Sequence, residues 1–181
     1  MEELIDVLDE NGIKTGEILP RSEIHKKGLW HRIIVVAIIN EKNEILLQQR
    51  SKTKTKNPNM WDISAAGHVS SGQTSLSAAA REINEEISIN LAHNVTVNDF
   101  RYVFSYRKEE KVSDNYYDRQ FFDFFILRKE NLNIEDIRYQ EEEVQAIKWV
   151  SFSELRELIE NKVLIERDAV YKELENYIFN I

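Results

Sequence analysis

The sequence predicts an α+β domain in which helices cover a mixed β-sheet, and three features lead to that prediction. Short apolar runs, rich in β-branched and aromatic residues, alternate with polar turns. One strongly helical segment, residues 74–87, interrupts them. The last third of the chain is charged and helical, and no linker or repeat divides the sequence. We therefore expect residues 1–181 to form a single domain with an N-terminal β appendage and C-terminal helices.

The predicted strands follow from β-branched and aromatic apolar runs. In chain order they lie at residues 6–16, which form a hairpin, and at 33–39, 45–50, 61–65, 100–106, 120–127 and 146–150. The dipeptide Asn11-Gly12 favours the first hairpin. The run 33–39 is typical of a strand buried on both faces, and we expect it to form a long hairpin with 45–50. A polar loop is expected at 108–115, between two antiparallel strands.

Three helices are predicted. Residues 74–87 repeat apolar side chains at helical spacing around an alanine-rich centre, which makes this the clearest helix of the chain. Ser151 and Glu154 form a capping-box pattern that starts a second helix, ending near residue 159. Val170, Leu174 and Tyr177 mark the last one.

Composition excludes several classes of protein. The chain has 181 residues and a formal charge of −8, with 42% hydrophobic residues, which is enough for a core. It contains no cysteine, which excludes disulfides and thiol nucleophiles and fits a cytoplasmic protein. The net acidity argues against nucleic-acid binding, and the sequence shows neither a long apolar run nor a basic, apolar start. We expect no membrane partner, and a homodimer is compatible with the sequence.

One face of the predicted helix 74–87 carries three carboxylates, Glu82, Glu85 and Glu86. Like charges at this spacing repel one another, and only Arg81 offers local relief. Carboxylate oxygens are hard ligands suited to Mg²⁺ or Mn²⁺, and such an ion can accept the oxygens of a diphosphate. This face therefore predicts a divalent-cation site, with a solvated acidic helix face as the alternative.

A glycine-bounded loop precedes the acidic helix and runs Gly67-His68-Val69-Ser70-Ser71-Gly72-Gln73. Such a loop can bring a strand end against the helix and form a concave metal and phosphate site. Loop and helix together, from Gly67 through Arg81-Glu82-Ile83-Asn84-Glu85-Glu86 to Ile87-Ser88-Ile89, resemble the signature of the Nudix hydrolases. The departures are Gln73, where the family has Glu, and Ser88, where it has Gly. A neutral Gln73 adds no charge to a metal cluster, so the number of metal ions stays open.

The resemblance implies an α/β/α sandwich and a metal-dependent hydrolase that cleaves a diphosphate linkage in a nucleoside diphosphate derivative or a related compound. It implies Mg²⁺ (or Mn²⁺) as cofactor, Glu82 and Glu86 as the principal ligands, and Glu85 as a further ligand or the base. Arg81 would orient the glutamates. Some family members take the base from a loop outside the motif, so Glu143, in an acidic turn, is a second candidate beside its reading as an ordinary exposed residue.

Three residues are expected to contact the small-molecule diphosphate substrate. Gly67 and His68 belong to the loop of the motif, and Arg50 ends a predicted strand near it. A guanidinium pairs well with phosphate, although a solvated Arg50 is an equal alternative.

Within the family, the chain resembles the branch that contains isopentenyl diphosphate isomerase. His25 and His31 fall in the region that supplies the isomerase's histidines, and His68 matches its loop histidine. Ala66, however, stands where the isomerase has its catalytic Cys, and Asp118-Arg119-Gln120 stands where it has a pair of Glu. The sequence therefore favours hydrolysis over isomerisation.

Two alternatives to a hydrolase are kept, an isomerase-like enzyme and a non-catalytic nucleotide-sensing module for which Gln73 is the clue. The three histidines are interpreted either as hydrogen-bonded structural residues under the N-terminal appendage or as residues of a substrate or metal site.

Overall fold

A computed structural model describes residues 2–87 and 95–179. Ser88 and Ile89, the last positions of the sequence motif, lie outside the described residues.

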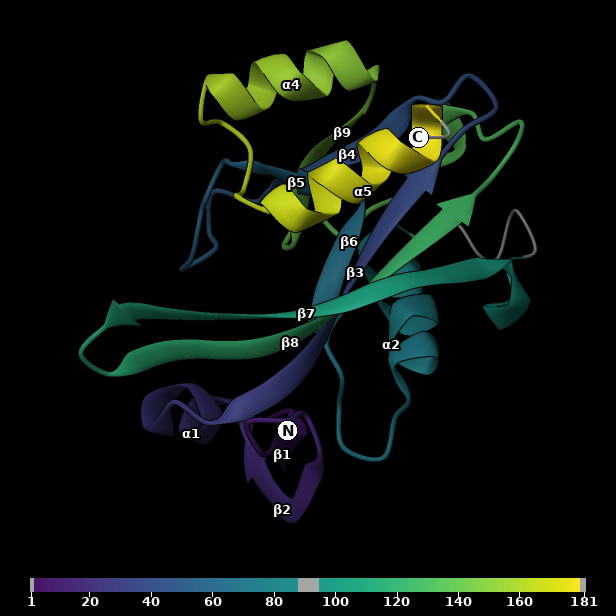
Figure 1. Ribbon diagram of the computed structural model, residues 1–181. Helices are drawn as coiled ribbons and strands as arrows, with labels where there is room; N and C mark the ends of the chain where they lie inside the picture. Colours follow the sequence, from purple (N-terminus) through teal and green to yellow (C-terminus); the bar gives the residue numbers. More distant parts are fainter. Residues whose placement is uncertain (1, 88–94, 180–181) are drawn as a thin grey trace.

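Groups of consecutive strands are separated by helices along the chain, and two helices end it (Figure 1). The strands are β1 (Leu4–Leu8), β2 (Lys14–Pro20), β3 (Trp30–Ile39), β4 (Ile45–Arg50), β5 (Trp61–Ile63), β6 (Ala65–His68), β7 (Phe100–Ser113), β8 (Tyr116–Arg128) and β9 (Val144–Val150). The helices are α1 (Arg21–Lys27), α2 (Ser75–Glu82), α4 (Phe152–Glu160) and α5 (Asp168–Phe179), and a π-helical turn, Ile83–Ile87, extends α2. The sequence did not predict α1.

The mixed sheet is confirmed, and β3 lies at its centre. It pairs in parallel with β8 along its whole length and antiparallel with β6. From Ile34 to Ile39 its residues are fully buried, as expected for a strand covered on both faces. The β1–β2 hairpin forms at its predicted turn, where Gly12 has the positive φ that Asn-Gly turns use.

The predicted long hairpin of β3 and β4 is wrong in its extent, because the two strands pair only at Ile39 and Ile45. Beyond that point they separate, and the expected strand 61–65 is divided between them: β5 pairs with β4, and β6 pairs with β3. Ser64 bridges the gap, since its hydroxyl accepts from the Ile38 N–H at 2.8 Å and donates to the Leu46 carbonyl at 2.6 Å. The split brings Gly67 and Gln48 toward one cavity.

The predicted polar loop at 108–115 is also wrong over most of its length. Residues 108–113 continue β7, and the strands β7 and β8 form one long antiparallel ribbon that turns after Ser113 (Figure 1). The charged side chains of this segment suit a strand pair that is exposed to water. Oppositely charged residues face each other on the two strands, as where Arg119 pairs with Glu109 at 3.1 Å.

Helices cover both faces of the sheet, which confirms the α/β/α sandwich. On one face α2 and its π-turn bury Ala78, Ala79, Ile83 and Ile87 against β3 and β8. On the other, Leu155 of α4 and Val170 and Leu174 of α5 pack on the opposite side of the same strands. In the described part of the chain no helix is long and apolar enough to cross a membrane.

Candidate active site

The end of the acidic helix presents two glutamates to the interior. Thr74 caps α2 by accepting from the Ser77 N–H, and alanines fill the side that faces the sheet. The helix then widens into the π-turn, a feature frequent at functional sites. Glu82 and Glu86 are therefore both buried, at 8% and 7% exposure, on the sheet side of a helix that elsewhere buries only apolar residues there.

Gly67 and Gln48 hold these carboxylates against the sheet. A Cβ at position 67 would overlap the Glu82 carboxylate, so only glycine leaves room for it. Glu86 Oε2 accepts from Gln48 Nε2 at 2.8 Å and from the Ala66 N–H at 3.3 Å. Within the described residues no hydrogen bond reaches Glu86 Oε1. Gly67, which we expected to contact the substrate, lines the cavity and also leaves room for the Glu82 carboxylate.

Burial without sufficient partners raises both carboxyl pKa values. Burial is the main cause for Glu82, whose pKa rises to about 7 although Arg81 opposes the rise. Burial, followed by the charge of Glu82, raises the pKa of Glu86 to about 8. Two close carboxylates that resist ionisation are suited to a hard divalent cation, because a cation would compensate both charges. The donor set therefore fits a hard divalent cation such as Mg²⁺ or Mn²⁺.

Arg81, which we expected to orient the glutamates, forms ion pairs with two of them. Its Nη2 pairs with Glu82 Oε1 at 2.8 Å and donates to the His68 carbonyl at 2.8 Å. Its Nη1 pairs with Glu85 Oε2 at 2.7 Å. Gln73 accepts from Arg81 Nε at 3.4 Å and from the Ser70 N–H at 3.3 Å, so its amide stabilises the loop and the arginine rather than facing the glutamate pair.

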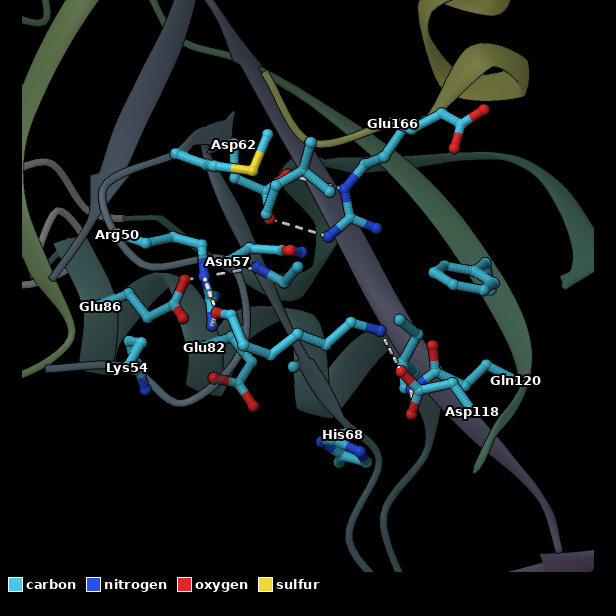
Figure 2. Close-up of a pocket in the computed structure, with 18 of the residues that line it drawn as sticks. Arg50, Lys54, Asn57, Asp62, His68, Glu82, Glu86, Asp118, Gln120 and Glu166 are labelled. Atoms are coloured by element: carbon cyan, nitrogen blue, oxygen red, sulfur yellow. Dashed lines mark hydrogen bonds and ion pairs between the residues drawn. The ribbon is translucent and has the colours of Figure 1, made fainter. Parts of the chain in front are cut away.

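A cavity of about 900 Å³ opens in front of the two buried glutamates (Figure 2). Glu85 and Glu143, the candidate bases, both line it, but Glu85 is held by Arg81 and half exposed, and Glu143 pairs with Lys54. Arg50 lines the cavity as well, and its guanidinium donates to the Lys56 carbonyl. The structure thus gathers the predicted site residues around one space of ligand size.

Three buried histidines form a cluster, of which His68 lines the same cavity. The ligand atoms of His25, His31 and His68 all lie within 4.8 Å of one another, close enough to hold a metal ion. They are also linked by hydrogen bonds: His25 Nε2 and His68 Nε2 are 3.3 Å apart, and His31 Nδ1 donates to the Leu29 carbonyl at 3.0 Å. His31 Nε2 faces the Gln120 amide at 3.3 Å.

Burial keeps two of these rings uncharged at neutral pH. It is the main cause that lowers the pKa of His31 to about 4 and the pKa of His68 well below its usual value. Both nitrogens of His31 and Nε2 of His68 thus have hydrogen-bond partners within the protein, in contrast to Oε1 of Glu86.

Sequence reasoning missed several charged groups of the cavity. Asp118 is buried, receives a 2.9 Å contact from His25 Nδ1, and pairs with Lys56. Asp62 binds Arg167 through two nitrogens at 2.7 and 2.8 Å, a buried pair that ties the segment before α5 to the cavity wall. The Lys-rich loop before Pro58 was the available signal for Lys54 and Lys56; Arg167 carried none, because its partner lies 105 residues away.

Comparisons with known proteins agree with this geometry. A family model described as the NUDIX domain matches residues 29–172. The chain is 37% identical over 161 residues to Nudix hydrolase 3 of Arabidopsis thaliana, a match that covers 87% of this chain and 20% of that protein. It is 38% identical over 153 residues to an uncharacterized Nudix hydrolase of Listeria monocytogenes, covering 84% of this chain and 82% of the other.

More distant similarities extend to an isomerase and to a solved fold. Isopentenyl-diphosphate Delta-isomerase 2 of Photorhabdus laumondii is 27% identical over 161 residues, covering 89% of this chain and 84% of the isomerase. The fold is similar to the crystal structure of DR0079 from Deinococcus radiodurans, with a TM-score of 0.70, 19% sequence identity, and coverage of 96% and 98% of the two chains.

Proposed function

From the premise that this chain belongs to the Nudix family, we propose that it hydrolyses a diphosphate linkage in a nucleoside diphosphate derivative or a related compound, with Mg²⁺ or Mn²⁺. One observation carries the proposal: Glu82 and Glu86 are buried side by side, with raised pKa values, at the wall of a cavity that also contains cationic side chains. The cationic side chains of the cavity suit an anionic substrate, and the two carboxylates suit a divalent cation.

Glu82 and Glu86 would hold the cation, with Gly67 leaving the space and Arg81 fixing the Glu82 carboxylate. A bound divalent cation supplies charge neutralisation at the phosphate oxygens. Gln48 and the Ala66 N–H keep Glu86 in place during turnover.

Glu85 and Glu143 are the two carboxylates proposed to take the proton from the attacking water. Each has a cationic partner, Arg81 for Glu85 and Lys54 for Glu143, and both glutamates line the cavity. Comparing Glu85→Gln with Glu143→Gln in a pH–rate profile separates them, because the variant of the true base loses the acidic limb.

Arg50 and His68 are proposed to contact the substrate's phosphates. His68, uncharged by burial, would donate or accept a hydrogen bond, whereas Arg50 would add charge while its other nitrogens keep the Lys-rich loop in place. A cytoplasmic location and a homodimer accompany the proposal as predictions from sequence.

An isomerase is the second enzyme considered, since a relative of that name is 27% identical to this chain. Its reaction requires proton transfer at an unactivated carbon. Ala66, whose N–H binds Glu86 at the cavity wall, has no thiol for it. Conversion of isopentenyl to dimethylallyl diphosphate by the purified protein would favour that reading over hydrolysis.

The decisive experiment is a screen for phosphate or pyrophosphate release from a library of nucleoside and alkyl diphosphate derivatives with Mg²⁺. We expect turnover of at least one compound, lost on chelation and reduced on the order of 100-fold or more in Glu86→Gln. Glu157→Gln, exposed on α4 and outside the cavity, is the matched control and should retain full activity. No turnover across the panel would contradict the proposal and favour a sensing module.

A further inference from the structure

A lysine side chain from the Lys-rich loop between β4 and β5 extends across the cavity. Asn57 lies on the side that holds Arg50 and Glu86, whereas Asp118 lies on the opposite side (Figure 2). Lys56, the residue before Asn57, nevertheless pairs through Nζ with Asp118, so its side chain bridges the two walls.

The backbone of Lys56 is fixed while its ammonium group is held only by neighbours that can release it. Arg50 donates to the Lys56 carbonyl from Nε at 3.3 Å and from Nη2 at 3.1 Å, which anchors the loop. At the other end, Asp118 has a second partner in His25 at 2.9 Å and would stay paired without the lysine. Glu110, 3.4 Å from Lys56 Nζ, is half exposed and can be solvated instead.

Two arginines of the cavity are more firmly held than Lys56. Arg167 is buried and binds both oxygens of buried Asp62, so its release would leave an unpaired charge in the interior. Arg81 divides its nitrogens among Glu82, Glu85 and the His68 carbonyl. Lys56 thus has an anchored backbone, a side chain that crosses the cavity, and ion-pair partners that a ligand can replace.

We propose that Lys56 is a substrate-binding residue whose ammonium group leaves Asp118 and Glu110 to bind a phosphate of the diphosphate substrate. The inference rests on the proposed function for the identity of the anion. Asp118 and Glu110 keep the lysine charged, as the raised pKa of Lys56 indicates, although burial opposes it. They also compete with the substrate, so removing the exposed competitor should strengthen binding.

Isothermal titration calorimetry with inorganic pyrophosphate in the presence of Mg²⁺ tests the assignment directly. We expect Lys56→Gln to raise Kd about tenfold, as for the loss of one charge-assisted hydrogen bond. Lys56→Arg should stay within about threefold of the wild type, because the charge is kept. Lys52→Gln, an exposed lysine of the same loop outside the cavity, is the matched control and should leave Kd unchanged.

Glu110→Gln separates substrate binding from a structural link between loop and ribbon. If Lys56 exchanges partners, this variant lowers Kd about twofold, since one surface competitor is gone. If Lys56 only ties the loop to β7 and β8, Glu110→Gln weakens pyrophosphate binding in the same direction as Lys56→Gln, which would overturn the proposal. An unchanged Kd in Lys56→Gln would overturn it as well.

Failure of this inference is distinguishable from failure of the proposed hydrolysis. A wild-type protein that binds pyrophosphate through Lys56 but cleaves no diphosphate leaves the inference standing and removes the hydrolase. If the wild-type protein cleaves diphosphates and Lys56→Gln changes neither Kd nor KM, the role of Lys56 is refuted and the hydrolase remains.

Discussion

The buried glutamates line the cavity and the buried histidines reach it through His68, but the two clusters differ in whether their polar atoms have partners. Glu82 and Glu86 repel each other and have pKa values near 7 and 8, which shows that their charges are not compensated by the protein. His31 and His68 are kept neutral by burial, and hydrogen bonds engage both nitrogens of His31, to Leu29 and Gln120, and Nε2 of His68, to His25.

This contrast between the two clusters indicates that ligand geometry alone does not identify a cation site. The histidine cluster has the spacing of one, yet its groups are satisfied without an ion. The glutamate pair is suited to an ion, because Arg81 at Glu82 and the two hydrogen bonds to Glu86 return only part of the free energy that ionisation costs. Each prediction below tests one side of that contrast.

The largest effect is expected at Gly67. Gly67→Ala places a Cβ in the space of the Glu82 carboxylate and should lower turnover at least about tenfold and stability by about 1–3 kcal/mol. Activity assays and urea unfolding measure the two. Glu82→Ala should relieve most of the stability loss in the double variant, and additive losses would show that the overlap is not the cause.

On the histidine side, His31→Leu should lower stability without a comparable loss of metal-dependent turnover. The substitution leaves the Leu29 carbonyl and the Gln120 amide without their partner, a cost of about 1–3 kcal/mol in unfolding free energy. Urea unfolding and kcat are the readouts. Complete loss of turnover in a folded His31→Leu protein would indicate that the metal binds at the histidines and not at the glutamates.

The metal-free protein should become less stable as the pH rises from 6.5 to 8. A carboxyl whose pKa is raised in the folded state keeps its proton there while the unfolded chain ionises, so its contribution is lost between about pH 4.5 and 8. His31, with a lowered pKa, acts in the opposite direction and only below about 6.5.

Urea unfolding with a chelator at the two pH values should show a fall on the order of 2 kcal/mol. Mg²⁺ should reduce the fall, and so should Glu86→Gln, which cannot ionise. A fall of equal size in Glu86→Gln would assign the pH dependence to other groups.

The smallest effect is expected at the motif departure. Gln73→Glu places a charge beside Arg81, whose Nε already donates to Gln73, and should raise turnover about two- to threefold by fixing Arg81 more firmly. Steady-state kinetics measure it. A decrease, or a rise of 100-fold, would mean that position 73 acts on the metal itself.

Local patterns predicted most of the fold but not its long-range pairing. The apolar period of residues 74–87 and the capping box at Ser151 gave two helices correctly, because both signals are complete within one segment. The separation of β3 from β4 is bridged by Ser64, which is distant in sequence from both strands, and the β7–β8 ribbon extends through backbone pairing of two polar segments. Neither is visible in a single run of sequence.

The candidate site divides in the same way. Glu82, Glu86 and Arg81 were predicted because the motif places them within one helical turn and a half. Asp118, Asp62 and Arg167 were missed as site residues because each reaches the cavity only through pairing of distant strands or of the segment before α5. Residue spacing predicts which side chains one helix places in the site. The pairing of distant strands determines which residues lie on the opposite wall of the cavity.

Electron spin echo envelope modulation of bound Mn²⁺ tests most directly which of the two buried clusters holds the cation. Carboxylate oxygens bring no nitrogen to the metal, whereas an imidazole ligand produces ¹⁴N modulation. The account predicts stoichiometric Mn²⁺ binding without ¹⁴N modulation, lost in Glu86→Gln and kept in His31→Leu. Strong ¹⁴N modulation, with binding kept in Glu86→Gln and lost in His31→Leu, would contradict it.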